Sequence, residues 1–361
     1  DFFLDTPYQN LALLLDIPIV KASEVTADNP LGTGPYSLED GIGGKHLQRV
    51  VGWWCSSDDL VAKDSSIALV EAESPSQIRD EFEFDELGLA ISNPMSDSYA
   101  EYRCDYELWE VDSGFMMYIG CNVTYSKFFD DGTLRTFLTY GIDRQTLVDD
   151  NYGGLALPTT LPISPMSPYY SKSLATNYDY DEMRFIDAAS KFRVPTNDKG
   201  VPRTLQLLVN SDDSARLRCA RNIAATLTEL GLACETVESP TSVYEARLQA
   251  ANYDIYLGIT KLPTTADLSE FYRPWGEMSW GGLANETIYN MVNQSLADRG
   301  NYYNLHKLVA DDGRIIPVMA GYYAIYAKRG VLSDLNPARD NVFYYTLGKT
   351  MESSKVATQF S

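Results

Sequence analysis

The histidines and cysteines of this chain are few enough that catalytic patterns can be checked one at a time. A Ser–His–Asp or Cys–His arrangement would have to use His46 or His306, because the sequence has two histidines. His46 stands in the alternating stretch GGKHLQRV, which is typical of a strand or hairpin, and His306 stands in NYYNLHKLVADD, which is typical of a helix. Neither lies near a nucleophile signature such as G-x-S-x-G. We therefore assign both histidines a structural or surface role and expect no catalytic residue.

Carboxylates and cysteines give no sharper pattern. With 50 Asp and Glu residues, the presence of acid pairs of the glycosidase kind carries almost no information. Five cysteines without a C-x-x-C spacing, together with two scattered histidines, do not form a metal-ligand set. The odd cysteine count argues against a full disulfide framework, and Cys219 and Cys234 fall on apolar faces, where a free thiol packs as a small hydrophobe. We expect no metal site and no cofactor.

The glycine-rich stretch NPLGTGPYSLED, residues 29–40, is a candidate phosphate loop. It lacks the lysine of G-x-x-x-x-G-K-[ST] and the third glycine of G-x-G-x-x-G. Pro35 also removes a backbone N–H where a phosphate loop would need one. We therefore predict a tight turn that leads into a strand beginning near Tyr36.

Composition narrows the classes of partner. The chain has 361 residues, 45% of them apolar and 22% charged, which suits a globular protein with a sizeable core. Its net charge of -21 argues against nucleic acid or an anionic membrane surface as a partner. No stretch approaches the roughly 20 apolar residues of a membrane span. Because the sequence starts at Asp1, an export signal or a lipid-anchor cysteine would lie upstream.

Secondary structure is clearest between Arg203 and Ile259. RTLQLLVN predicts a strand, and Ser211–Asp213 supply an N-cap for the helix that follows. The apolar face of that helix recurs at spacings of three and four, at Leu217, Ala220, Ala224, Leu227 and Leu230. LACETV, SVYEARLQAANY and DIYLGI then predict a strand, a helix and a strand. This order indicates an α/β lobe with a largely parallel sheet.

Two apolar strands flank this lobe, over residues 113–123 and 315–327. If both connect two lobes, residues 1–122 form a partial lobe I that is discontinuous and is completed by residues 315–361. Residues 123–314 then form lobe II. Two lobes joined by two strands make a hinge, and a hinge makes a cleft.

Several segments in order along the chain resemble the extracellular solute-binding protein family 5, the peptide/nickel class of ABC-transporter receptors. NPLGTGPYSLED resembles the turn and strand of the family's first lobe, and SPSQIRDEFEFDELGLA resembles a later element. The resemblance is strongest over residues 116–165 and extends from about Thr6 to Tyr345. Within that strongest part, the family pattern falls on Asn122, Phe129, Asp130, Arg135, Ile142, Asp143, Arg144, Gly154 and Pro162.

The resemblance implies an α/β, type II periplasmic-binding-protein-like fold whose two lobes are joined by hinge strands. It implies the extracytoplasmic substrate-binding component of an ABC importer for oligopeptides or dipeptides, without enzymatic activity. The implied location is periplasmic or, as a lipoprotein, at the cell surface. The implied partners are a small ligand and the transporter permease, and the implied state is a monomer. Relative to the family, the N-terminal part of lobe I is missing.

The resemblance also implies a ligand site on the hinge strands and on the loop that follows DIYLGI. Peptide-binding members carry a W…D..DP loop there, but here GITKLPTTADLSEFY has Ile259 for the tryptophan and no Asp-Pro pair. This departure argues against recognition of a free peptide N-terminus, and Lys261 would favour an anionic group. The expected ligand-binding residues are Tyr118, Asn122, Thr260, Lys261, Asp267, Trp275, Trp280 and Tyr322.

Two alternatives stay open at this stage. One is a secreted carbohydrate-active enzyme that uses a carboxylate pair and the tryptophans. The other is the same fold acting as a sensor or as an oligosaccharide-binding protein. A binding protein predicts no turnover of any substrate, whereas a glycosidase predicts that changing one of two carboxylates abolishes turnover.

Overall fold

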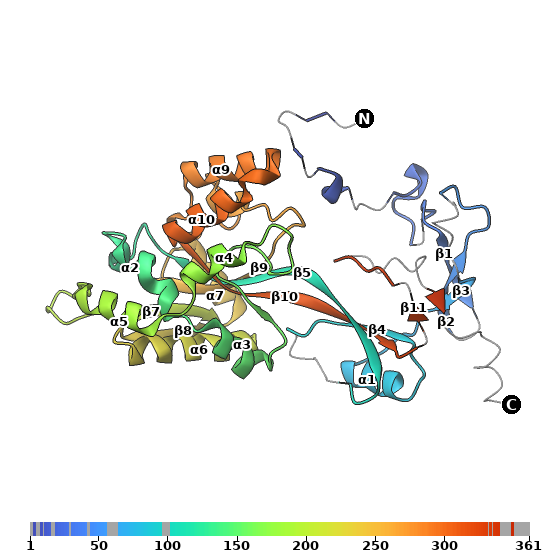
Figure 1. The fold of residues 1–361 in the computed structure, drawn as a ribbon, viewed down its shortest axis with the longest axis horizontal. Coiled ribbons are helices and arrows are strands. Elements are labelled where there is room, and N and C mark those ends of the chain that lie inside the picture. The colour runs from blue at the N-terminus through green and yellow to red at the C-terminus, as the bar shows by residue number, and fades with distance from the viewer. Residues whose placement is uncertain are drawn as a thin grey trace. The chain divides into compact units, whose positions relative to one another are not determined.

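The computed structural model describes residues 3–4, 8–9, 11–15, 19–28, 30–41, 44–55, 64–95, 102–330, 332–333, 335–339 and 348–349. The chain divides into two compact units, drawn together in Figure 1. The first unit comprises Asp1–Leu15 and Asp112–Tyr322, and the second comprises Asp16–Val111 and Tyr323–Ser361. The lobe boundaries expected from the sequence, at 122/123 and 314/315, differ from these divisions and stay a prediction.

Seven described strands form one sheet in the order β4-β10-β5-β9-β7-β8, with β6 beside β10. Their bounds are β4 Leu89–Ser92, β5 Tyr106–Cys121, β6 Leu157–Pro158, β7 Leu205–Asn210, β8 Cys234–Ser239, β9 Ile255–Lys261 and β10 Ile315–Lys328. β7 is parallel to β8 and to β9, whereas β5 is antiparallel to β9. The predicted strand–helix–strand–helix–strand order, with parallel strands, is therefore confirmed.

Helices α6 (Ser214–Glu229) and α7 (Thr241–Gln249) connect the three parallel strands. Asp213 caps α6, because its Oδ1 accepts a hydrogen bond from the Arg216 N–H at 2.9 Å. Gly231 follows the helix with a φ of 98°, a left-handed conformation that favours glycine. Leu217, which was expected on the apolar face, is only half-buried. The buried face of α6 consists of Ala215, Cys219, Ala220, Ile223, Ala224 and Leu227.

Two tyrosines and two glycines hold β5 and β9 together in a reciprocal arrangement. Tyr118 pairs in register with Gly258, and Gly120 pairs with Tyr256. Each ring lies over the glycine of the other strand, so that a Cβ built on Gly120 would come within 2.2 Å of the Tyr256 ring. The Tyr256 hydroxyl donates to the Tyr118 hydroxyl at 3.3 Å. Glycine is needed at both positions because the rings occupy the space of a side chain.

Seven further described helices belong to the first unit. They are α2 Thr133–Phe137, α3 Arg144–Tyr152, α4 Lys172–Ala175, α5 Glu182–Lys191, α8 Ser269–Tyr272, α9 Glu286–Ala297 and α10 Tyr302–Asp312. Short 3-10 turns are η1 Leu11–Leu14, η2 Ala22–Glu24, η3 Lys127–Phe129, η4 Leu138–Gly141, η5 Thr176–Tyr178, η6 Trp280–Gly282 and η7 Arg299–Asn301. Figure 1 shows α9 and α10 together on one side of the first unit, where they contact each other.

Arg144, the first residue of α3, is buried with 5% exposure. Its guanidinium donates to the carbonyls of Pro317 in β10, Thr139 and Ile142, and to the Thr139 hydroxyl at 2.8 Å. A longer contact of 3.5 Å reaches the carbonyl of Tyr178. Burial lowers the pKa of Arg144 to about 10, which leaves it protonated at neutral pH. The side chain therefore fixes α3 and η4 against β10.

His306 lies inside α10 with 0% exposure. Its ring is 5.8 Å from that of Tyr302, and within the described residues neither ring nitrogen has a hydrogen-bond partner. Burial disfavours the charged imidazolium and lowers the pKa of His306 to about 4. A neutral, enclosed imidazole agrees with the structural role expected from the sequence.

The second unit contains a small sheet, a helix and an aromatic cluster. Strands β1 (Tyr36–Gly41), β2 (Gly44–Arg49) and β3 (Ser66–Ala68) form an antiparallel sheet in that order. Helix α1 (Pro75–Glu83) begins after the N-cap Ser74, and β11 (Leu332–Ser333) pairs with β12 (Gly348–Lys349). The ring of Tyr326 lies within 6.4 Å of the rings of three other aromatic residues, namely Phe82, Tyr102 and Tyr106.

The stretch LGTGPY forms a turn ahead of β1, as predicted. The Thr33 carbonyl in this turn accepts hydrogen bonds from the indoles of Trp53 and Trp54, at 2.8 and 2.9 Å. The Val50 N–H donates to the Pro35 carbonyl at 2.9 Å. The turn is therefore tied to the end of β2 by backbone carbonyls.

Replacing Gly120 by Ala tests the tyrosine–glycine arrangement. The new methyl group would overlap the Tyr256 ring, and overpacking of this kind costs about 1–3 kcal/mol. We expect the melting temperature of the first unit to fall by several degrees, measured by calorimetry. Gly88→Ala is the control, because a Cβ there meets nothing within 4 Å. Equal melting temperatures for the two variants would contradict this account of the β5–β9 pair.

His306 predicts a pH dependence of stability. The unfolded chain binds a proton near pH 6.5, whereas the folded protein binds it only near pH 4, so unfolding takes up a proton between these values. Stability is therefore complete above about pH 6.5 and falls by about 3 kcal/mol as the pH drops to about 4. Denaturant titrations at several pH values measure the free energy of unfolding. In His306→Leu this decrease in the free energy of unfolding between about pH 6.5 and 4 should be lost, and in His46→Gln it should be retained. If His306→Leu showed the same decrease in the free energy of unfolding as the wild type, other titrating groups would be its cause.

Candidate functional site

The topology of the sheet singles out one edge of the first unit. From β7 the chain passes through α6 to β8 on one side, and α7 then returns it to β9 on the other side. The carboxyl ends of β7 and β9 therefore lie at a point where the strand order reverses, which is where α/β sheets bind ligands. Because β5 is antiparallel to β9, its Phe115 pairs with Lys261 at the same edge.

The loop after β7 is tied to the start of α7. Asn210, 7% exposed, donates through Nδ2 to the Thr241 hydroxyl at 3.0 Å and accepts from the Asp212 N–H at 2.9 Å. One carboxylate oxygen of Asp212 accepts from the Thr241 hydroxyl at 2.7 Å and from its N–H at 2.9 Å. These hydrogen bonds lower the pKa of Asp212. The loop is thus a fixed, polar part of the edge.

The end of β9 and the loop after it carry three of the expected ligand-binding residues. Thr260 is half-buried and Lys261 is exposed, both at the end of β9. The next residue, Leu262, donates its N–H to the Gly114 carbonyl at 2.9 Å and so fixes the loop to β5. Asp267 is half-buried, and its Oδ1 accepts from the Ser269 N–H at 2.8 Å at the start of α8. These three residues therefore lie on one continuous stretch, which consists of the last two residues of β9 and the loop that follows.

Two tyrosines from distant parts of the chain hold the middle of this loop. Thr265 is 1% exposed; its carbonyl accepts a hydrogen bond from the Tyr302 hydroxyl of α10 at 2.5 Å. Tyr8 donates to the Thr265 hydroxyl at 3.2 Å, and the following Gln9 donates its N–H to the Leu296 carbonyl at 3.0 Å. Burial and the charge of Asp267 raise the pKa of Tyr8, against the effect of its hydrogen bond. The Tyr8 hydroxyl is therefore a donor at neutral pH.

Trp275 stands on a braced loop that follows α8. Its side chain is 96% exposed, and its φ of 62° is a left-handed conformation that is rare for a bulky residue. Arg273 and Glu270 form two hydrogen bonds, at 2.9 and 2.8 Å, and the Glu277 N–H donates to Glu270 at 2.9 Å. Backbone strain of this kind is often retained at functional sites. Trp280, by contrast, is partly buried against the core cluster.

The other expected ligand-binding residues lie in the interior. Tyr118 is 1% exposed and contacts Tyr256 and Phe271 through its ring edges. Asn122 is 0% exposed; its Nδ2 donates to the carbonyls of Ala251 and Tyr253, and its Oδ1 accepts from the Tyr125 N–H. Tyr322 is 5% exposed. Because these side chains are enclosed, we do not carry them into the proposed site.

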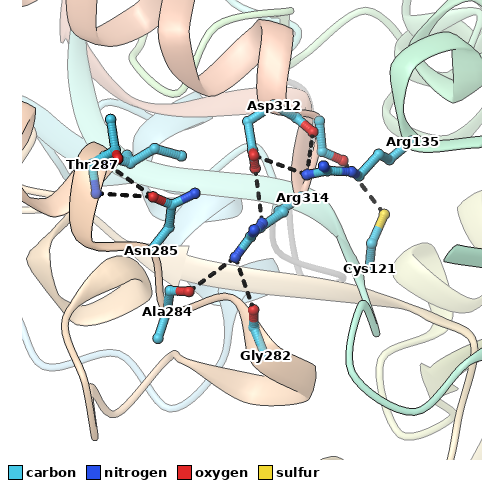
Figure 2. A network of polar contacts seen from close by, with 10 residues as sticks. Cys121, Arg135, Gly282, Ala284, Asn285, Thr287, Asp312 and Arg314 are labelled. Atoms are coloured by element: carbon cyan, nitrogen blue, oxygen red, sulfur yellow. Dashed lines mark hydrogen bonds and ion pairs between the residues drawn. The ribbon is translucent and has the colours of Figure 1, made fainter. Parts of the chain in front are cut away.

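An ionic network supports the start of β10 (Figure 2). Asp312 lies between two guanidiniums: its Oδ1 accepts from Arg135 at 2.8 Å, and its Oδ2 is 3.2 Å from Nε of Arg314. Arg314 also donates to the carbonyls of Gly282 and Ala284, at 3.1 and 2.9 Å. The network joins α2, the chain after η6 and the entry to β10, which positions the loop that carries Trp280.

The cysteines and the metal-ligating side chains were also candidates for chemistry. The five cysteines are free thiols, and burial raises the pKa of Cys219 and Cys234 to about 12, so these two thiols are poor nucleophiles. No cluster of three metal-ligating side chains occurs among the residues that the structure describes. Nor is any helix in the described ranges long and apolar enough to cross a membrane.

Sequence reasoning missed the Asn210–Asp212–Thr241 cluster and Tyr8. A polar residue that ends a buried strand, as Asn210 does, is a usable signal for a site at the carboxyl edge. Tyr8 gives no local signal, because its partner Thr265 is 257 residues away in the sequence.

Comparison with known proteins identifies the family. The profile of bacterial extracellular solute-binding proteins, family 5 (middle), matches residues 4–282. The chain therefore belongs to the family 5 extracellular solute-binding proteins, and both the resemblance and the α/β fold class expected from the sequence are confirmed. No curated protein sequence matches the chain.

Solved structures share the fold at low sequence identity. The periplasmic murein tripeptide binding protein MppA matches with a TM-score of 0.75 and 13% identity, over 93% of this chain and 68% of that one. The substrate binding protein CtaP of Listeria monocytogenes matches with 0.73 and 15%, over 97% and 75%. NikA of Brucella suis, in complex with Fe(III)-EDTA, matches with 0.71 and 17%, over 96% and 76%.

Proposed function

We propose that the protein is the substrate-binding component of an ABC importer and that its ligands are oligopeptides or dipeptides. The observation that carries this proposal is the fixed polar edge at the ends of β7 and β9 in a chain of family 5. The permease of the importer is the proposed partner. The proposed location is outside the cytoplasmic membrane, in the periplasm or as a cell-surface lipoprotein, and the proposed state is a monomer.

The charges of the edge suit the two ends of a short peptide. Lys261 is exposed at the end of β9, and Asp267 is half-buried in the loop that follows this strand. An ammonium pairs with a peptide carboxylate, and a carboxylate pairs with an α-amino group, each as a charge-assisted hydrogen bond. This loop lacks the Asp-Pro pair that peptide-binding relatives use to recognise the peptide N-terminus. We therefore assign the dominant contact to Lys261 and the carboxylate of the peptide.

Trp275 adds an aromatic contact to the proposed site. An indole held almost wholly in water on a braced loop offers a large apolar surface at little cost in conformational entropy. The fold comparison is consistent with peptides, since one structural neighbour is a murein tripeptide binding protein. Capture is proposed to proceed by lobe closure, with the closed state favoured only by a ligand that contacts both lobes.

Ligand titrations test the proposal. Di- and tripeptides at about 100 times Kd should stabilise the protein by about 2.7 kcal/mol, seen as a rise in melting temperature. Lys261→Met should weaken peptide binding by about tenfold or more, because one charged contact is lost, and Trp275→Ala should do the same through lost aromatic contact. Isothermal titration calorimetry measures both.

Tyr125→Ala is the matched control, because Tyr125 is 73% exposed on the first unit and lies outside the proposed site. It should bind peptides as the wild type does. Binding of nickel–histidine complexes or oligosaccharides without any peptide would retain the solute-binding class and refute the peptide assignment. Turnover of any ligand in the panel would refute the binding-protein assignment itself.

A further inference from the structure

A cavity lies on the first unit, and no residue of the proposed peptide site lines it. Its volume is about 570 Å³. It is formed by η4, the run from α4 to the start of α5, and one face of α10. We call it the tyrosine pocket, because four tyrosines from these elements line it, namely Tyr140, Tyr178, Tyr180 and Tyr303.

The rings of the pocket fall into two groups. Tyr140 and Tyr178 are 5% and 8% exposed and form its floor. The guanidinium of Arg184 lies 3.7 Å from the centroid of the Tyr140 ring and covers it. Tyr180 and Tyr303 are 36% and 48% exposed, so their rings present apolar surface to an occupant. Two accessible rings over a polar floor suit a ligand with both apolar and hydrogen-bonding faces.

The charged groups of the pocket are largely used within the protein. Asp311 accepts hydrogen bonds from the Tyr178 hydroxyl, at 2.6 Å, and from Lys307. Burial opposes ionisation of Asp311, but these two donors outweigh it and lower its pKa. Asp181 caps α5 by accepting from the Arg184 N–H at 2.9 Å. An ionic ligand would have to compete with these pairs, so the arrangement favours a neutral one.

The groups that remain for an occupant are hydroxyl, amide and carboxylate oxygens. The Nδ2 of Asn177 donates a hydrogen bond to the Ser173 carbonyl at 3.3 Å, and its Oδ1 can accept a hydrogen bond from an occupant. The pKa of Tyr180 is raised by burial and by nearby carboxylates, so its hydroxyl is a donor at neutral pH. Asp179 is exposed at the same rim. Adjacent hydroxyls of a sugar ring match such donors and acceptors, and the C–H face of the ring packs on tyrosine.

We propose that the tyrosine pocket binds a neutral saccharide of one or two rings, independently of the peptide ligand. The volume lies within the range of small-molecule sites and suits this size. The stacking surface is assigned to Tyr303 and Tyr180, and the hydrogen bonds to Asn177 and Asp179. This site goes beyond the proposed importer function, since it shares no residue with Lys261, Asp267 or Trp275.

Saturation-transfer difference NMR on the full chain tests the site, with maltose, cellobiose, trehalose and N,N′-diacetylchitobiose as probes. At least one disaccharide should bind, and Tyr303→Ala should weaken its binding by about tenfold, the equivalent of about 1.4 kcal/mol. Because Tyr303 is half exposed, this variant should fold. Asn177→Ala is a second variant that leaves the aromatic surface intact and should also weaken binding.

Controls separate this site from the proposed peptide site. Tyr125→Ala, Lys261→Met and Trp275→Ala should all bind the disaccharide as the wild type does. Absence of binding by all four probes would overturn the proposal. So would disaccharide binding that Tyr303→Ala retains and Trp275→Ala loses, because the sugar would then occupy the other site. Binding of putrescine in place of the sugars, lost in Asp179→Asn, would show a cation site instead.

Discussion

The buried guanidinium of Arg144 is the interaction on which much of the first unit depends. It satisfies carbonyls of η4 and of Pro317 in β10, and it reaches the carbonyl of Tyr178. A buried ion is costly unless hydrogen bonds compensate it, so this side chain is stable only when those carbonyls hold their positions. The same side chain therefore places a central strand of the sheet and the floor of the tyrosine pocket. The position of β10 and the position of the pocket floor are therefore coupled through one side chain.

Local signals explain why the α/β part of the fold could be predicted. The cap at Asp213 and the apolar period of α6 are properties of neighbouring residues, and they define the helix without reference to the rest of the chain. The misassignment of Leu217 shows the limit of that reasoning. Spacing identifies the apolar face of a helix, but how far each residue on that face is buried depends on which strand packs against it.

The site was predictable in part. Thr260, Lys261 and Asp267 follow a recognisable strand, so their loop could be located from the sequence. The sequence could not show that the rings of Tyr118 and Tyr256 face glycines on the partner strand, because that depends on the register of β5 against β9. Asn122 was expected to face a ligand, yet its amide is used by the backbone around Ala251 and Tyr253. An asparagine that follows a strand has the same sequence signature in either role.

The exposure of the tryptophans gives the protein an optical property. Of the five tryptophans, Trp275 is 96% and Trp54 is 75% exposed, whereas Trp280 packs partly against the core. A hydrated indole emits at longer wavelength than an enclosed one and is open to collisional quenchers. A molecule that covers the loop of Trp275 would therefore change the part of the emission that comes from this indole, which makes Trp275 an intrinsic fluorescent reporter at that position.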